Sequence, residues 1–334
     1  MTETETIRFF IERGGQFHQF HLNAIGNRGN NRVYRMDAAE GVFLVKHYFQ
    51  DPSDQRDRFA AEHAFYSFLW NLGIRRTPKP IQWLFEERLA IFEFIRGNKP
   101  AVADTAMICA AIDFFKELNA NNGSPEANRL PEASESCFSL REHLDCVGRR
   151  VEALCVIEPG TEIDRAALEF VNSKMAPALK SVKDRIIRAT SPGELESKLS
   201  IGGRCISPSD FGFHNSLLPE DGNLRFFDFE YAGWDDPAKA ICDFFCQPAV
   251  PVDHCHFDRF LTELLQIFPC SDLEKRVSLL MPLYQIKWCC IMLNEFLPSA
   301  AARRLFSAGV TGLGKLKSEQ LGKAQKLFST VKTG

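Results

Sequence analysis

The sequence predicts an α+β fold with two lobes, in which a small antiparallel β-sheet with one main helix is followed by a larger, mostly helical lobe. Two observations lead to this prediction. Short runs rich in β-branched and aromatic residues are concentrated in the first hundred residues. Apolar residues at helical spacing dominate from about residue 104 onward. The pattern changes at 96–100 (RGNKP), so we expect the lobes to span 1–97 and 98–334.

The first lobe is predicted from alternating strand and turn signals. Asn and Gly residues separate the first two extended runs, and the sequence DAAEG separates the second from the third. A helix with apolar residues on recurring faces follows and ends at Gly73. The expected strands span 20–26, 31–37, 42–49, 81–85 and 88–95, and the expected helix spans 57–72.

The second lobe is predicted to be helical except for one hairpin. The hairpin strands at 215–218 and 224–229 are joined by the turn PEDGN. The polar segment 121–136 is rich in Gly, Pro and Ser and is predicted to be a surface loop. The expected helices span 104–120, 138–155, 162–190, 237–247, 255–268, 272–296 and 315–330.

The composition is that of an ordinary globular chain. Of its 334 residues 45% are hydrophobic and 25% are charged, which is enough to bury a sizeable core. A net charge of -3 gives no strong basic field, so we expect no nucleic-acid partner. The start of the sequence (MTETE) lacks the apolar region of a secretory signal, and no apolar run is long enough to span a bilayer. The oligomeric state is not predicted.

Eleven cysteines are present without paired CxxC spacing. Cys242, Cys246, His254 and Cys255 come closest to a metal-ligand cluster. Cys242 and Cys246 lie one helical turn apart beside Phe244, however, which is typical of buried thiols. The odd number and the absence of a secretory signal favour a reducing, cytoplasmic setting.

The stretch 207–237 (SPSDFGFHNSLLPEDGNLRFFDFEYAGWDDP) carries the pattern that indicates chemistry. It contains Asp210, then Asn215 five residues later, then Asp228 on the far strand of the hairpin. Phosphoryl transfer needs a carboxylate that receives a hydroxyl proton, and oxygen ligands that hold Mg²⁺ against nucleotide phosphates. One loop with this spacing delivers a base and an amide ligand, and the hairpin returns the second carboxylate. The alternative is a hairpin whose Asp and Asn residues only cap and turn the backbone.

The run 228–233 (DFEYAG) gives this pattern a family resemblance. The sequence resembles the aminoglycoside phosphotransferase and choline/ethanolamine kinase superfamily, in which the metal-binding motif is often D-F-E followed by Y-A-G. The resemblance implies a protein-kinase-like two-lobed fold and ATP- and Mg²⁺-dependent transfer of phosphate to a small acceptor. It also implies that Asp210 is the catalytic base and that Asn215 and Asp228 are magnesium ligands.

By the same resemblance, the first lobe binds the nucleotide. The segment AIGNRGNNRVY resembles the family's nucleotide-covering loop, in which Gly26, Gly29 and Asn30 would let backbone N–H groups approach phosphate. Lys46 stands where such kinases keep the lysine that contacts the α- and β-phosphates. Glu62 on the following helix is its matching partner. Taken singly, a strand lysine or a helix glutamate is more often a solvated surface charge.

The segment 93–97 (EFIRG) ends the last strand of the first lobe. The resemblance implies that this is the connection between the lobes, where backbone groups at Glu93 and Ile95 would meet the adenine edge. Ordinary packing between the lobes explains the same residues equally well.

Two positions depart from the family pattern. Pro208 stands where the family usually has a histidine, two residues before Asp210. A proline can stiffen the same loop through its fixed φ. Ala240 stands where many relatives carry an aspartate, and the nearest acid is Asp243. Asp243 is either a shifted support for the catalytic loop or a surface charge.

The leading interpretation is a kinase that phosphorylates a hydroxyl of a sugar, polyol or amino alcohol. A catalytically silent nucleotide-binding protein is the alternative, motivated by Pro208 and the incomplete glycine loop. A protein kinase fits less well, because no A-P-E-like segment follows Asp228.

The sequence says less about the acceptor. Residues 235–334 contain twelve Lys or Arg against ten Asp or Glu, so a polycationic aminoglycoside is not favoured. Trp234, Tyr284 and Trp288 could form part of an aromatic cage for a quaternary amine. Aromatic residues at such spacing are more often part of a core.

Overall fold

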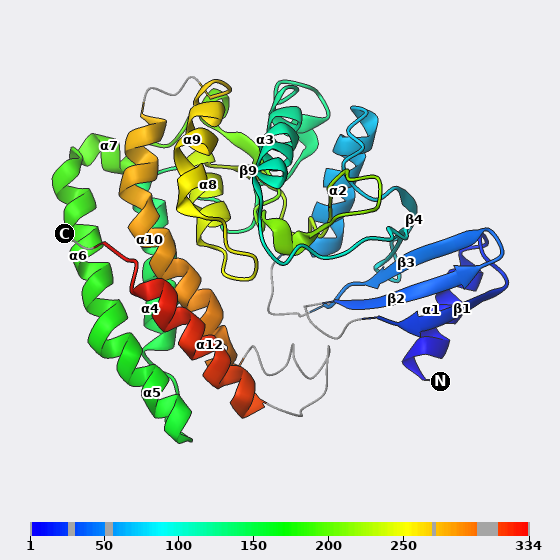
Figure 1. Cartoon of the computed structure of the whole chain (residues 1–334), viewed down its shortest axis with the longest axis horizontal. Coiled ribbons are helices and arrows are strands. Elements are labelled where there is room, and N and C mark those ends of the chain that lie inside the picture. The colour runs from blue at the N-terminus through cyan, green and yellow to red at the C-terminus, as the bar shows by residue number, and fades with distance from the viewer. Residues whose placement is uncertain (1, 26–30, 51–55, 269–271, 299–312, 333–334) are drawn as a thin grey trace.

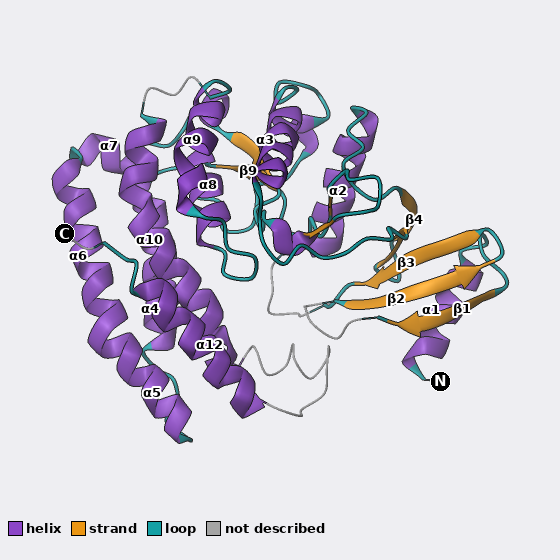
Figure 2. Cartoon of the chain, in the orientation of Figure 1, coloured by secondary structure: helices purple, strands orange, loops and turns teal. Residues whose placement is uncertain are grey.

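A computed structural model describes residues 2–25, 31–50, 56–268, 272–298 and 313–332. A five-stranded antiparallel sheet lies at one end of the molecule, and helices make up most of the remainder (Figure 1). Figure 2 shows the same division by secondary structure, with the long strands gathered beyond helix α2 (Arg58–Asn71). The predicted α+β architecture is therefore confirmed.

The sheet has the strand order β1-β2-β3-β5-β4, and each neighbouring pair is antiparallel. Since β3 and β5 pair directly, Lys46 on β3 lies opposite Ala90 on β5. All five strands and the helix predicted for this part of the chain are present, with ends shifted by a few residues. The strands are β1 (Phe20–Ala24), β2 (Arg32–Ala38), β3 (Gly41–His47), β4 (Pro80–Leu84) and β5 (Leu89–Glu93).

One helix of this region was not predicted. Helix α1 (Glu3–Arg13) begins with a capping box formed by Thr2 and Glu5. Its residues Ile7 and Ile11, four apart and so on one helical face, are fully buried in a small apolar cluster with the sheet. The sheet therefore carries a helix on each face, because alternate residues of β5 point to α1 and to α2.

The second half of the chain packs around the long helix α10 (Leu273–Leu293), which contacts α4, α8 and α12. By length and composition Leu273–Phe296 could cross a membrane, but 67% of its most apolar window is buried inside the protein, as in a core helix. The other α-helices of the described ranges are α3 (Thr105–Asn119), α4 (Leu140–Leu154), α5 (Glu162–Phe170), α6 (Ala176–Ala189), α7 (Pro192–Glu196), α8 (Pro237–Cys246), α9 (Phe257–Leu265) and α12 (Leu313–Phe328).

The predicted single helix over 162–190 is interrupted. A π-helical turn, Val171–Met175, separates α5 from α6. Pro177 enters the first turn of α6 and has no N–H to bond to the preceding turn, which accounts for the break in regular α-helical hydrogen bonding.

Short strands in the second half bring distant segments together. The predicted hairpin forms β7 (Ser216–Leu217) and β8 (Arg225–Phe226), while β6 (Cys205–Ser207) pairs with β9 (Gly233–Asp235), a pairing that was not predicted. The prediction of a surface loop over 121–136 is wrong in part, because Ala127, Leu130 and Ala133 are buried. Ala133 is buried and its N–H donates to Trp234 O at 2.8 Å. A Cβ on Gly233 would lie 2.2 Å from Pro131 O, so this contact requires glycine.

Ten of the eleven cysteines lie in the described residues, and all ten are free thiols. Cys242 and Cys246 are buried in the core, as predicted. Across the described ranges, no group of three or more His, Cys, Asp or Glu side chains is placed to hold a metal ion.

Candidate active site

The predicted residues Lys46, Glu62 and Asp228 meet at one point. Lys46 Nζ lies 2.6 Å from Glu62 Oε2 and 2.5 Å from Asp228 Oδ1. The lysine comes from β3, the glutamate from α2 and the aspartate from the loop after β8. Lys46 and Glu62 are 6% and 1% exposed, whereas the Asp228 side chain is 38% exposed. The predicted lysine–glutamate pair is therefore formed, and it reaches the predicted metal ligand.

Electrostatics keep this lysine charged. Burial alone would lower the pKa of Lys46, but the carboxylates of Asp228, Glu62 and Glu230 outweigh it and raise the pKa above its ordinary value. Tyr48 OH donates to Glu62 Oε2 at 2.5 Å, so the glutamate has a second buried partner. The ammonium group therefore stays charged throughout the physiological pH range.

Glu62 also fixes the loop that carries Asp228. Its other oxygen, Oε1, accepts a hydrogen bond from Phe229 N at 2.9 Å. Asp228 has a φ of +68°, a left-handed conformation that costs a non-glycine residue about 1–3 kcal/mol. The surrounding contacts hold the aspartate in this conformation with one carboxylate oxygen on Lys46.

Asp210 and Asn215 form the second half of the site. Asn215 Nδ2 donates to Asp210 O at 3.0 Å and to Asp210 Oδ2 at 3.2 Å. His214 Nε2 lies 3.2 Å from Asp210 Oδ1. Phe227 N donates to Asn215 O at 3.0 Å, which joins this loop to the residue before Asp228. The five residues predicted as base, metal ligands and lysine pair are therefore linked by a continuous series of contacts.

Asn215 and Asp228 offer too few oxygens to bind magnesium alone, but enough to bind it together with a phosphate ligand. The Asn215 amide nitrogen is used by Asp210, which leaves its oxygen for a cation. Asp228 has one carboxylate oxygen on Lys46 and a side chain that is 38% exposed. Magnesium prefers six oxygens and is commonly bound by one or two protein oxygens together with phosphates and water. Asn215 and Asp228 match that requirement.

The predicted adenine residues lie at the end of β5. The Glu93 carboxylate accepts a hydrogen bond from Lys79 N at 3.1 Å, so its side chain is bonded to the residue directly before β4. In the ranges that the structure describes, the backbone N–H and C=O of Ile95 have no protein partner. Gly26, Gly29 and Asn30 lie outside the described residues.

Sequence reasoning missed two members of the site. Glu230 is 4% exposed, lies 3.8 Å from Lys46 Nζ and accepts a hydrogen bond from Asn31 Nδ2. Asn31 Oδ1 in turn accepts Phe49 N at 3.1 Å. The signal for Glu230 was available, since it is the third residue of the D-F-E motif. Nothing in the sequence marked Asn31 as its partner.

The structure answers two questions that the sequence left open, one about Asp243 and one about the possible aromatic cage. Asp243 is not a surface charge, since it is 3% exposed and accepts hydrogen bonds from Lys287 at 3.1 Å and Trp288 at 2.8 Å. Tyr284 is 2% exposed and lies 2.7 Å from His143 Nδ1, while Trp234 Nε1 donates to Ala127 O at 3.0 Å. The three aromatic residues considered for a cage therefore have their polar groups bonded inside the protein.

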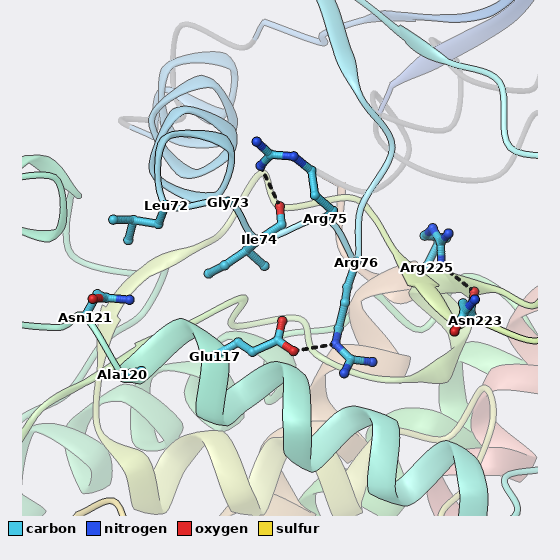
Figure 3. Close-up of a pocket in the computed structure, with 10 residues that line it drawn as sticks. All are labelled: Leu72, Gly73, Ile74, Arg75, Arg76, Glu117, Ala120, Asn121, Asn223 and Arg225. Atoms are coloured by element: carbon cyan, nitrogen blue, oxygen red, sulfur yellow. Dashed lines mark hydrogen bonds and ion pairs between the residues drawn. The ribbon is translucent and has the colours of Figure 1, made fainter.

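A cavity of about 510 Å³ lies elsewhere, between the end of α2, the end of α3 and the β7–β8 hairpin (Figure 3). Arginines dominate its polar lining, but each is held by protein groups. Arg76 Nε lies 2.9 Å from Glu117, Arg225 lies 3.1 Å from Asp221, and Arg75 donates to Trp70 O at 3.0 Å. The cavity includes none of the predicted site residues.

Comparisons with known proteins agree with this geometry at the level of the fold. No protein-family model and no curated protein matches the sequence. A choline kinase from Streptococcus pneumoniae matches with 15% identity over 98% of this chain and 99% of that chain, with a TM-score of 0.56. A spectinomycin phosphotransferase solved with ADP and spectinomycin matches with 10% identity over 95% and 94%, with a TM-score of 0.60.

An ethanolamine kinase from Plasmodium vivax matches with 14% identity over 94% of this chain and 83% of that chain, with a TM-score of 0.54. The similarity to these structures spans nearly the whole chain and both lobes. The chain thus has the fold of the choline kinase, ethanolamine kinase and aminoglycoside phosphotransferase structures, as the D-F-E motif predicted.

Proposed function

We propose that this chain, which has the fold of small-molecule kinases, is an ATP- and Mg²⁺-dependent phosphotransferase that phosphorylates a hydroxyl group of a small metabolite. The observation that carries the proposal is the bridge from Glu62 through Lys46 to Asp228. A charged lysine beside a half-exposed carboxylate is the arrangement that binds a nucleotide triphosphate with its cation. The spectinomycin phosphotransferase with the same fold was solved with ADP, which supports a nucleotide as the phosphate donor.

In this mechanism each residue of the cluster has one task. Lys46 binds the α- and β-phosphates and is oriented by Glu62. Asn215 and Asp228 would hold the magnesium ion, which neutralises charge on the phosphates. Asp210 accepts the proton of the acceptor hydroxyl while the new bond from that oxygen to the γ-phosphorus forms and the bond to the β–γ bridging oxygen breaks, releasing ADP. The loop with Gly26, Gly29 and Asn30 covers the phosphates, and the backbone at Glu93 and Ile95 meets adenine.

We propose a sugar, polyol or amino alcohol as the acceptor. Trp234 and Tyr284 are 9% and 2% exposed, so their ring faces are not open to a quaternary amine, which favours a sugar or polyol over choline. Ten free thiols among the described residues favour a cytoplasmic location.

Screening a panel of sugars, polyols, amino alcohols and aminoglycosides for ATP consumption tests the proposal. Turnover should depend on magnesium and on one class of acceptor, and the Asp228→Asn variant should lose it. The Arg75→Ala variant, altered in the remote cavity, is the matched control and should retain turnover. If the wild-type protein binds Mg-ATP but consumes none with any acceptor, the chain is a nucleotide-binding protein without transferase activity.

A further inference from the structure

A buried lysine outside the predicted site contacts the catalytic loop. Lys239 on α8 is fully buried, and its Nζ donates to Ser209 Oγ at 3.1 Å. Ser209 directly precedes Asp210. The other two contacts of the ammonium group are to Asp235 at 2.5 Å and to Asp243 at 3.4 Å. The ammonium group donates hydrogen bonds to Ser209 and Asp235, and its contact with Asp243 is an ion pair.

Charge balance does not require the contact with Ser209. Lys287 lies 3.1 Å from Asp243, so two buried lysines face two buried aspartates in this cluster. The cluster is neutral without any contribution from the catalytic loop. Lys239 nevertheless directs one N–H donor to a neutral hydroxyl, and a purely electrostatic role for the lysine does not explain that contact.

Ser209 needs such an anchor because of its backbone. Its φ is +64°, in the left-handed region that favours glycine. The hydroxyl donates to Ser134 O at 3.3 Å and accepts from Lys239, so it is held from two sides. Ser209 N donates to Ser207 Oγ at 3.0 Å, which closes the turn. The orientation of the next peptide unit, and hence the direction of the Asp210 side chain, follows from this conformation.

We propose that Lys239 is a positioning residue for Asp210 and that it acts through the Ser209 hydroxyl. His214 and Asn215 hold the carboxylate of Asp210 directly, and Lys239 holds the backbone behind it. The kinetic consequence rests on the proposed phosphotransfer, because only then does the position of Asp210 set the rate. Displacing a catalytic group by about 1 Å can lower a rate about a hundredfold.

Three variants test this assignment. Ser209→Gly removes the hydroxyl but accepts a φ of +64° without strain, so the fold should persist. Lys239→Met removes the ammonium group, and Lys287→Met removes the other buried lysine of the same cluster without touching the catalytic loop. With the acceptor found in the panel screen, Ser209→Gly and Lys239→Met should lower kcat at least about tenfold with an unchanged KM for Mg-ATP. Lys287→Met should keep the wild-type kcat.

A second measurement does not depend on turnover. The His214 imidazole contacts Asp210, so its NMR signal reports the position of that carboxylate. Among the eight histidines, His214 is identified by the signal that disappears in His214→Gln. Ser209→Gly should shift this signal and Lys287→Met should not.

The proposal is overturned if Ser209→Gly leaves kcat and the His214 signal unchanged, or if Lys287→Met lowers kcat as much as Lys239→Met. If Lys239→Met does not fold, Ser209→Gly alone decides. If the wild-type protein shows no turnover, the proposed function fails, and the His214 signal still tests the positioning.

Discussion

Two buried lysines organise ionic clusters that differ in their contact with solvent: the open cluster around Lys46 and the sealed cluster around Lys239. Lys46 in the first half faces Glu62 and Asp228, and the Asp228 side chain is 38% exposed. Lys239 in the second half faces Asp235 and Asp243, whose side chains are 0% and 4% exposed. The first cluster thus has a carboxylate open to solvent, whereas both carboxylates of the second are buried.

This difference separates residues that act on a ligand from residues that hold the protein around it. A buried ion pair is by itself weak support for either role, since the cost of removing two charges from water offsets their attraction. Exposure of one partner is the property that indicates a binding site here. The following four predictions test that distinction, beginning with the largest expected effect.

Lys46→Ala should abolish turnover, and Glu62→Ala should lower it less. The open cluster works as one unit, because Glu62 contacts both Lys46 and the loop that carries Asp228. A lost charge-assisted contact costs about 1.5–3 kcal/mol, and the double variant should be no worse than Lys46→Ala alone. Steady-state kinetics of the single and double variants measure this coupling. Fully additive losses would remove Glu62 from the role of partner.

Asp210→Ala should lower kcat about a thousandfold and leave Mg-ATP affinity nearly unchanged. The carboxylate acts on the acceptor hydroxyl and makes no contact with Lys46 or with Asp228 in the structure. Single-turnover kinetics and calorimetric titration with Mg-ATP separate the two effects. A variant that keeps more than about a tenth of the wild-type kcat would exclude Asp210 as the base.

Lys239→Met should lower the free energy of unfolding by about 3–5 kcal/mol, because it leaves the buried Asp235 carboxylate without the ammonium group that it faces. Asp228→Asn should cost less than about 1 kcal/mol, since this carboxylate is already partly solvated. Urea unfolding of both variants at pH 7 compares the sealed and the open cluster directly. Equal losses in the two variants would mean that exposure does not distinguish the clusters.

Asp236, which follows Asp235 of the sealed cluster and pairs with Arg276, should make the stability of the protein depend on acid. Burial alone would raise the pKa of Asp236, but Arg276 and His143 outweigh it and lower the pKa to about 2 from 3.8. A depressed carboxyl pKa stabilises the fold above pH 4 by about 2 kcal/mol, and this contribution is lost as the pH falls from about 4 to 2. The difference in free energy of unfolding between the wild-type protein and Asp236→Asn should therefore shrink over that range. A difference that stays constant from pH 5 to pH 2 would contradict the assigned pKa.

The sequence predicted the open cluster but not the sealed one, and the reason is physical. Asp210, Asn215 and Asp228 are constrained by chemistry to a recognisable spacing, and the order of Lys46 and Glu62 before them follows from the fold. Asp235, Lys239 and Asp243 recur every four residues, which on a helix resembles an exposed row of salt bridges. Only the packing of α8 against α10 shows that this row is buried.

The fold, too, was predicted where local sequence patterns determine it and missed where they do not. The five strands of the sheet follow from local patterns, whereas helix α1 has only two fully buried residues, Ile7 and Ile11, in eleven. So narrow an apolar face is easily overlooked in a polar segment. The pairing of β6 with β9 joins residues about thirty positions apart in short strands, and local patterns carry no information about it.

The segment that connects β5 to α3 is hydrogen-bonded to the β7–β8 hairpin. Asn98 and Leu218 exchange two backbone hydrogen bonds, of 3.1 and 2.9 Å, and a Cβ on Gly97 would lie 2.9 Å from Leu218 O. The connecting chain is thereby fastened to the hairpin immediately after Gly97. Any rotation of the sheet relative to the helices must then pivot on the few residues before this fastening, among them Ile95. Because the same backbone is proposed to hold adenine, such a rotation would be coupled directly to release of the spent nucleotide.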